Sequence, residues 1–213
     1  MNNTINNDNV SWKKTLSASA VICALMILSL GLFNRGYLVL VPYAAVMSIL
    51  VLCRSRIFLF ALSVSTFLGF AWVYIARGLY SYSNDSLTLM GMHMFTLIAF
   101  SMGLLGVYAI YSQFQQKLSL RLFKQRLLLY SFIYWILLIP FEWIGYHKFQ
   151  IQNSATSAYS GFFIFNCLHA PPLMQLAYLS FGPVFFIIFY LFERFISSRS
   201  GQIDSPYHWK TQR

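Results

Sequence analysis

The chain has 213 residues, of which 58% are hydrophobic and only 9% are charged. Soluble domains carry charge on about a quarter of their residues, so this composition excludes an ordinary soluble protein and predicts an integral membrane protein. The formal charge of +10 comes from 15 basic and 5 acidic residues. Such an excess fits either a nucleic-acid-binding protein or a membrane protein with basic cytoplasmic loops.

Six apolar runs take up most of the chain. A helix needs roughly 20 apolar residues to cross a bilayer, and continuous apolar runs favour helices over the strands of a barrel. We predict helical spans at residues 15–33, 37–53, 57–76, 87–111, 127–144 and 173–192. The expected fold is therefore an all-α, multi-pass transmembrane bundle of about six spans. It forms a single domain at residues 15–196, between polar tails at 1–14 and 197–213.

The basic residues fall on alternate connections between these spans. Twelve lie in the two tails and in the second and fourth loops, and three lie on the other side: Arg35, Arg77 and Lys148. The positive-inside rule therefore places both termini in the cytoplasm. Because the cations are spread over four short segments, we expect no nucleic-acid partner. We expect a protein of the bacterial cytoplasmic (inner) membrane, whose partners are the lipid bilayer and, as open alternatives, further copies of the chain or a membrane complex.

Residues 161–195 are too many for one straight span and too few for two. Pro171 and Pro172 divide them, because proline favours the first turn of a helix, and Pro183 predicts a kink in the last span. The apolar stretch before the prolines, "GFFIFNCLHA", is too short to cross. We expect it to be re-entrant or to lie in the outer interface, folded against the bundle.

Methionines gather at "MGMHMF", near the predicted start of the fourth span. Helical spacing places Met90 and Met94 on one face, with His93 beside Met90. Thioethers that converge from more than one element can bind copper, although methionine also serves as an adaptable packing residue in membrane helices. The sequence leaves both interpretations open. The cysteines at positions 23, 53 and 167 give no disulfide framework.

The stretch "IPFEWIGYH" places one of the five acidic residues, Glu142, near the outer end of the fifth span. Pro140 deprives the carbonyl of Ile136 of its helical partner one turn below this carboxylate. One interpretation is a carboxylate that reaches outward to water or pairs with Arg77 or Lys148. The other is a partly desolvated acid that gives or takes a proton.

Most of the side chains that could take part in catalysis or binding lie on the predicted outer side. Our candidate catalytic residues are Glu142, His147, Cys167 and His169. Our candidate substrate-binding residues are Arg77, Trp143, Tyr146, Tyr159 and Asn166. Cys167 and His169 would form a thiolate and its base, oriented by Glu142 or Asn166. The alternative is a cysteine that serves in packing, beside a histidine held by hydrogen bonds. Glu142, His147 and His169 have the donor types of a zinc or iron site, but no spacing such as HExxH supports one, so we predict no metal and no cofactor.

The segment "EWIG" at residues 142–145 is followed by a polar loop that contains tyrosines and then by "MQLAY" at 174–178. Over about fifty residues this arrangement resembles the membrane-bound lycopene cyclases and their hydratase relatives. In those proteins acids and aromatic residues on a helical bundle protonate a polyene and stabilise cations, and the resemblance implies for this chain that Glu142 is a proton donor. Those cyclases have paired acids after the proline, whereas Pro140 is followed by Phe141 and a single Glu142. From the residues alone, a membrane-embedded acid–base enzyme and a transporter, transport subunit or assembly factor remain alternatives.

Overall fold

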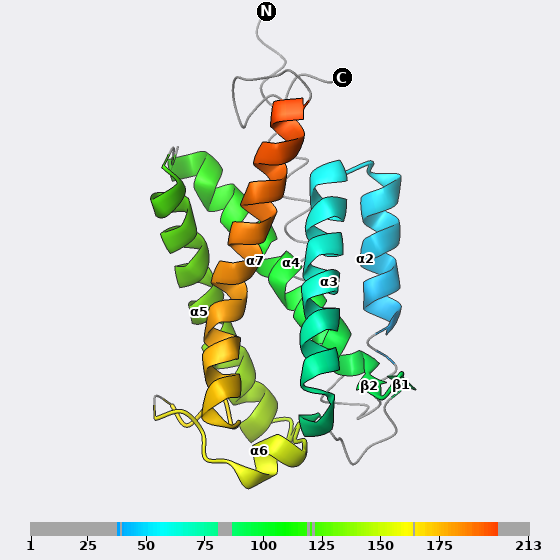
Figure 1. The fold of residues 1–213 in the computed structure, drawn as a ribbon, viewed down its shortest axis with the longest axis vertical. Helices are drawn as coiled ribbons and strands as arrows, with labels where there is room; N and C mark the ends of the chain where they lie inside the picture. The colour runs from blue at the N-terminus through cyan, green and yellow to red at the C-terminus, as the bar shows by residue number, and fades with distance from the viewer. Residues whose placement is uncertain are drawn as a thin grey trace, which may run out of the picture.

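The computed structural model describes residues 38, 40–80, 87–118, 120, 122–163 and 165–199. Within them the chain is a bundle of helices with one two-stranded sheet (Figure 1). The helices are α2 (Leu40–Leu52), α3 (Arg56–Ile75), α4 (Met94–Leu118), α5 (Phe123–His147), α6 (Ser154–Ala158) and α7 (Pro172–Arg199), with a 3-10 turn η2 (Arg77–Leu79). The predicted all-α membrane bundle is confirmed. The predicted first span at 15–33 lies outside the described residues.

Four described helices are long and apolar enough to cross a membrane, over Arg56–Ile75, Met94–Gln115, Phe123–His147 and Pro172–Phe195. The second predicted span, at 37–53, is instead the 13-residue helix α2. Its end is set by Arg54, whose left-handed backbone (φ 51°) turns the chain into α3. The third, fifth and sixth predicted spans agree with α3, α5 and α7, and the last two helices run a few residues beyond the predicted bounds.

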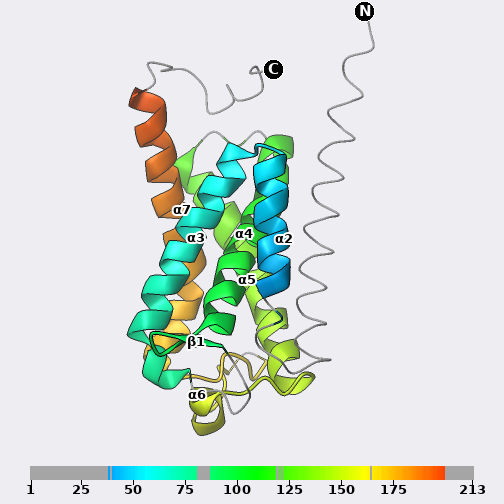
Figure 2. The ribbon, with the colours of Figure 1, turned by 90° about the vertical axis from the view of Figure 1, so that its right-hand side faces the viewer.

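Successive helices run in opposite directions, which gives the bundle two distinct ends (Figures 1 and 2). At one end, here called the basic end, α2 joins α3, α4 approaches α5, and α7 finishes. Its described cations are Arg54, Arg56, Lys117, Lys124, Arg126, Arg194 and Arg199. The other end, here called the loop end, holds η2, the small sheet, α6 and the connection from α5 to α7, with Arg77 and Lys148 as its described cations. The predicted alternation of basic and non-basic connections therefore matches the two ends of the molecule.

The fourth predicted span begins later than expected. Residues 88–93 form an antiparallel hairpin of β1 (Thr88–Leu89) and β2 (Met92–His93), and α4 begins only at Met94. Both turn residues, Met90 and Gly91, have positive φ (54° and 74°), as the tightest hairpin turns require. The prediction that Met90 and Met94 share a helical face is therefore wrong, because Met90 lies at the tip of the hairpin.

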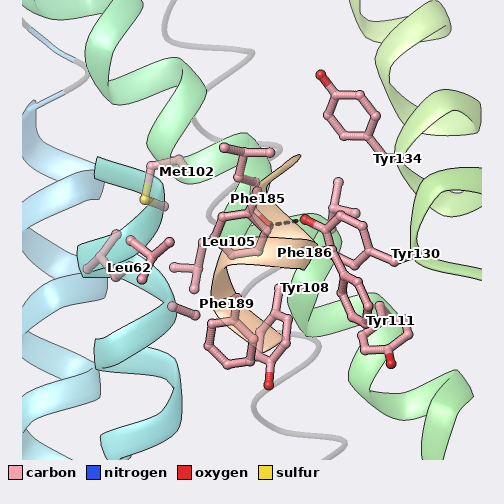
Figure 3. Close-up of a cluster of buried hydrophobic side chains, with 14 of the residues drawn as sticks. Leu62, Met102, Leu105, Tyr108, Tyr111, Tyr130, Tyr134, Phe185, Phe186 and Phe189 are labelled. Atoms are coloured by element: carbon pink, nitrogen blue, oxygen red, sulfur yellow. Dashed lines mark hydrogen bonds between the residues drawn. The ribbon is translucent and has the colours of Figure 1, made fainter. Parts of the chain in front are cut away.

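Helix α4 is the central helix of the bundle. In its most apolar stretch 61% of residues are buried, compared with 22% in α5. Its tyrosines meet rings from α5 and α7 in a cluster that we call the aromatic core (Figure 3). The ring centroids of Tyr108 and Phe189 are 4.6 Å apart, and those of Tyr130 and Phe186 are 5.1 Å apart. The other members of the aromatic core are Tyr111 and Phe185.

Helices α5 and α7 are in tight contact at Gly182. A Cβ atom at this position would overlap the ring of Tyr134, so only glycine permits the observed approach. The Tyr134 hydroxyl donates to the carbonyl oxygen of Tyr178, at 2.6 Å. A glycine on one helix therefore receives an aromatic side chain of the other, and a hydrogen bond fixes the contact.

Pro183 leaves one carbonyl of α7 without its helical donor, and a side chain of α5 donates a hydrogen bond to it. Pro183 has no N–H, so the carbonyl of Leu179 lacks the usual helical donor four residues on. The indole Nε1 of Trp135 donates to this carbonyl at 2.8 Å. In hydrocarbon no water can take the place of a missing donor, so this hydrogen bond stabilises α7 at the predicted site of its kink.

Candidate functional site

The connection before α7 folds into a tight turn at the loop end. Phe162 and Cys167 pair as an isolated antiparallel bridge, and Phe165, Asn166 and Leu168 adopt left-handed backbone conformations (φ 60°, 46° and 55°). Side chains 167–170 are consequently buried, against the ends of the helices. As predicted, the described part of this apolar stretch forms no spanning helix and folds onto the bundle.

His169 lies at the centre of the loop end. Its side chain is only 7% exposed, and its ring stacks on that of Tyr146, with centroids 3.6 Å apart and planes 10° apart. On another side it packs on Gly161, where a Cβ atom would lie 2.9 Å from His169 Nε2 and 2.6 Å from Asn166 Oδ1. Its buried Nδ1 has no hydrogen-bond partner in the described part of the chain. A buried polar atom without a partner is uncommon and requires an explanation.

His147 is held beside this ring by the turn. Its Nε2 lies 3.0 Å from the carbonyl oxygen of Asn166, and because a carbonyl only accepts, the imidazole carries its proton on Nε2. The His147 and His169 rings are 5.8 Å apart, and Trp143 packs on His147 from the preceding helical turn, at 5.2 Å. Four predicted site residues, Trp143, Tyr146, His147 and His169, are thus brought together. With Asn166 they form what we call the His169 cluster.

Glu142 occupies the same face of α5 as Tyr146, one turn earlier. It lies 19 positions after the start of α5, about 28 Å along the helix, and its side chain is half-buried. Its carboxylate is close enough to Cys167 to affect that thiol electrostatically. By helical spacing, Glu142 lies on the side of α5 that carries Tyr146 of the His169 cluster.

The electrostatics of the turn favour neutral groups. Burial raises the pKa of the Cys167 thiol, and the negative charge of Glu142 raises it further. Burial also lowers the pKa of His169, with a smaller contribution from the neighbouring His147. Cys167 is therefore a thiol and His169 a neutral imidazole at pH 7. This argues against the thiolate nucleophile that sequence adjacency suggested, and it leaves His169 able to donate or accept one hydrogen bond at Nδ1.

Two of the predicted binding residues, Arg77 and Tyr159, are not part of the His169 cluster. The guanidinium of Arg77 is exposed and lies over the ring of Tyr74, 4.7 Å from its centroid. Tyr159 is 45% exposed on the turn that follows α6. Their role in binding a substrate stays a prediction.

A buried chain of polar aromatic residues was missed by sequence reasoning. Trp72 Nε1 donates to the Tyr80 hydroxyl at 2.7 Å, and the Tyr80 and Tyr178 hydroxyls are 2.6 Å apart. Tyr80 follows η2, and its side chain is buried beside Cys167 and Leu168 in the same apolar cluster. Only the tertiary fold joins these three residues, which come from α3, the following loop and α7, so no local pattern could have identified them.

In the ranges that the structure describes, no three His, Cys, Asp or Glu side chains are grouped closely enough to hold a metal ion. A cavity of about 390 Å³ does open elsewhere, between α2 and α3, and is largely apolar. It contains a hydrogen bond of 3.0 Å between the hydroxyls of Tyr43 and Thr66.

Comparison of the chain with known protein families, with curated proteins and with solved structures finds no significant similarity.

Proposed function

We propose that this integral membrane protein is an enzyme that performs acid–base chemistry on a lipid-soluble substrate, of isoprenoid type, at the loop end of the bundle. The observation that carries the proposal is the buried, neutral imidazole of His169, whose Nδ1 has no partner in the described part of the chain. A buried polar atom left unpaired costs about 1–3 kcal/mol. A polar group of a bound substrate would remove this cost.

Each residue of the His169 cluster has a distinct task in this proposal. His169 binds the polar group of the substrate through Nδ1 and shares a proton with it. Tyr146, stacked on the imidazole, fixes the plane of the ring, and Asn166 fixes the tautomer of His147. Glu142, on the same side of α5, exchanges a proton with the reacting carbon or oxygen. This is the role that the resemblance to lycopene cyclases implies for it.

The test compares Glu142→Gln and His169→Gln with Glu193→Gln. Glu193 lies on α7 at the basic end, so its variant makes the same chemical change as Glu142→Gln far from the His169 cluster. Each protein is produced in a bacterium that makes isoprenoids, and the lipid extract is analysed by mass spectrometry. We expect the wild type and Glu193→Gln to yield a new product that both loop-end variants fail to make, at equal protein abundance.

A lipid profile that the wild type leaves unchanged would count against an enzyme. A second candidate, a membrane protein that binds a lipid without changing it, would then gain weight, because the cavity between α2 and α3 offers apolar walls and one pair of hydroxyls. Lipid that co-purifies with the wild type but not with Thr66→Leu would support this candidate.

A further inference from the structure

The connection between α6 and α7 exposes aromatic side chains at the loop end. Phe163 is 85% exposed, Phe165 70% and Tyr159 45%. We call these three residues the aromatic tip. Several large apolar side chains exposed on one short connection point to a site of interaction, so the tip requires a partner.

The backbone holds the tip outward. The bridge between Phe162 and Cys167 closes the turn, and the buried Cys167 fixes its inner side. Phe165 lies in this turn with φ 60°, a conformation that a bulky side chain adopts only where its surroundings impose it. The outward direction of Phe163 and Phe165 is thus built into the turn.

The surroundings of the tip identify the partner. No Asp, Glu, Lys or Arg occurs between Lys148 and Glu193, so the tip lies in an uncharged part of the chain. It comes just before the span Pro172–Phe195, whose first turns expose Leu173 (77%) and Leu176 (64%). These leucines face the lipid, because they are exposed on a membrane-spanning helix.

The other arm of the same connection has the opposite character. Lys148, Gln150 and Gln152 are exposed between α5 and α6, and side chains of this kind require water. One arm of the connection is therefore polar and the other apolar, although both lie at the same end of the bundle (Figure 1).

We infer that the aromatic tip inserts into the boundary between the headgroups and the acyl chains of the leaflet at the loop end, and that its partner is the phospholipid bilayer itself. Aromatic side chains favour this zone of a membrane, and an uncharged apolar turn that continues into a spanning helix fits it. The tip then holds the loop end at a fixed depth. This inference does not depend on whether the His169 cluster is catalytic.

The experiment places a nitroxide label on Phe163→Cys in the full chain, reconstituted in phosphatidylcholine vesicles. Cys23 and Cys53 are replaced by serine, and Cys167 remains because its side chain is fully buried. Collision rates with oxygen and with a water-soluble nickel chelate report the depth of the label. The same label on Gln152→Cys is the control for water, and on Leu173→Cys the control for lipid. The background without an added cysteine must give no signal.

We expect the ratio of oxygen to nickel collisions at position 163 to be close to that at Leu173 and several-fold above that at Gln152. A ratio equal to that at Gln152 would overturn the inference. If Phe163→Cys does not fold, the wild type decides the question by cross-linking to a phospholipid whose acyl chain carries a diazirine near the glycerol. Adducts within residues 159–165 support insertion, whereas adducts on 172–176 alone refute it.

Discussion

The aromatic core and the His169 cluster are both built from rings on α5 and on the chain around α7, yet they differ in how their polar atoms are satisfied. In the aromatic core the Tyr130 hydroxyl donates to the carbonyl of Leu104, at 3.3 Å. In the His169 cluster the rings are packed just as closely, but a buried nitrogen is left without a partner among the described residues. The aromatic core therefore stabilises the bundle, whereas the His169 cluster, in our proposal, is packed to bind a substrate.

The largest effect on stability is expected at the contact between α5 and α7. In Gly182→Leu the side chain would occupy the space of the Tyr134 ring and force α5 and α7 apart. Overpacking of this kind costs about 1–3 kcal/mol or more, and we expect loss of the folded bundle in a thermal-unfolding assay in detergent. In the control Gly103→Ala, on α4, the new methyl group meets nothing within 4 Å. That variant should match or exceed the stability of the wild type, because alanine is the better helix former.

A smaller and more local effect is expected at Gly161. The methyl group of Gly161→Ala would lie 2.6 Å from Asn166 Oδ1 and 2.9 Å from His169 Nε2, so His169 must move out of its buried position. We expect carbethoxylation of His169 by diethyl pyrocarbonate, measured by mass spectrometry, to become several times faster than in the wild type. Gly145→Ala, whose methyl group has no neighbour within 4 Å, serves as the control. Unchanged protection of His169 in Gly161→Ala would mean that the imidazole is not held as described.

The hydrogen bond from Trp135 to the carbonyl of Leu179 is expected to stabilise the bundle by a smaller amount. Trp135→Phe removes the donor and should cost about 1 kcal/mol. In a Pro183→Ala background residue 183 regains an N–H for the Leu179 carbonyl, so the same Trp135→Phe change should then cost less. A double-mutant cycle of thermal stabilities measures the difference, and strictly additive effects would show that the indole does not replace the lost helical donor.

The smallest effect is a dependence of stability on pH. Burial lowers the pKa of His169 below its usual 6.5, so in the acid range the unfolded chain binds a proton that the folded chain excludes. Protonation of His169 does not affect the free energy of unfolding above about pH 6.5. As the pH falls from there toward the lowered pKa, the folded state loses stability, by at most about 1.4 kcal/mol per pH unit. His169→Gln should flatten this part of the profile. His93, whose pKa burial also lowers, contributes in the same direction, so His93→Gln is the matched comparison.

Much of the fold could be predicted from the sequence, because span length and charge placement are properties of continuous segments. Helix α3 begins and ends within one residue of the predicted span at 57–76. The error at the start of α4 has a local cause: the run from Leu87 to Tyr111 contains no charged residue, and hydropathy alone does not reveal that Met90 and Gly91 turn the chain back.

The site was predictable only in part. Tyr146, His147 and His169 were named because they flank apolar segments near one membrane surface, and the structure brings them together. Their relation depends on the left-handed backbone at Asn166 and on the space beside Gly161, neither of which residue types can specify. The same limit applies to Tyr80, whose partners come from α3 and α7.

Pro183 has a consequence for the order in which the protein is assembled. The proline leaves the carbonyl of Leu179 without its helical donor. The indole of Trp135, which comes 44 residues before Leu179 in the chain, donates to this carbonyl instead. If α7 left the insertion machinery alone, it would carry that unsatisfied carbonyl into hydrocarbon, whereas α5 has by then been synthesised and can provide the indole. The pair is therefore expected to enter the bilayer together, with α5 retained at the exit site until α7 arrives.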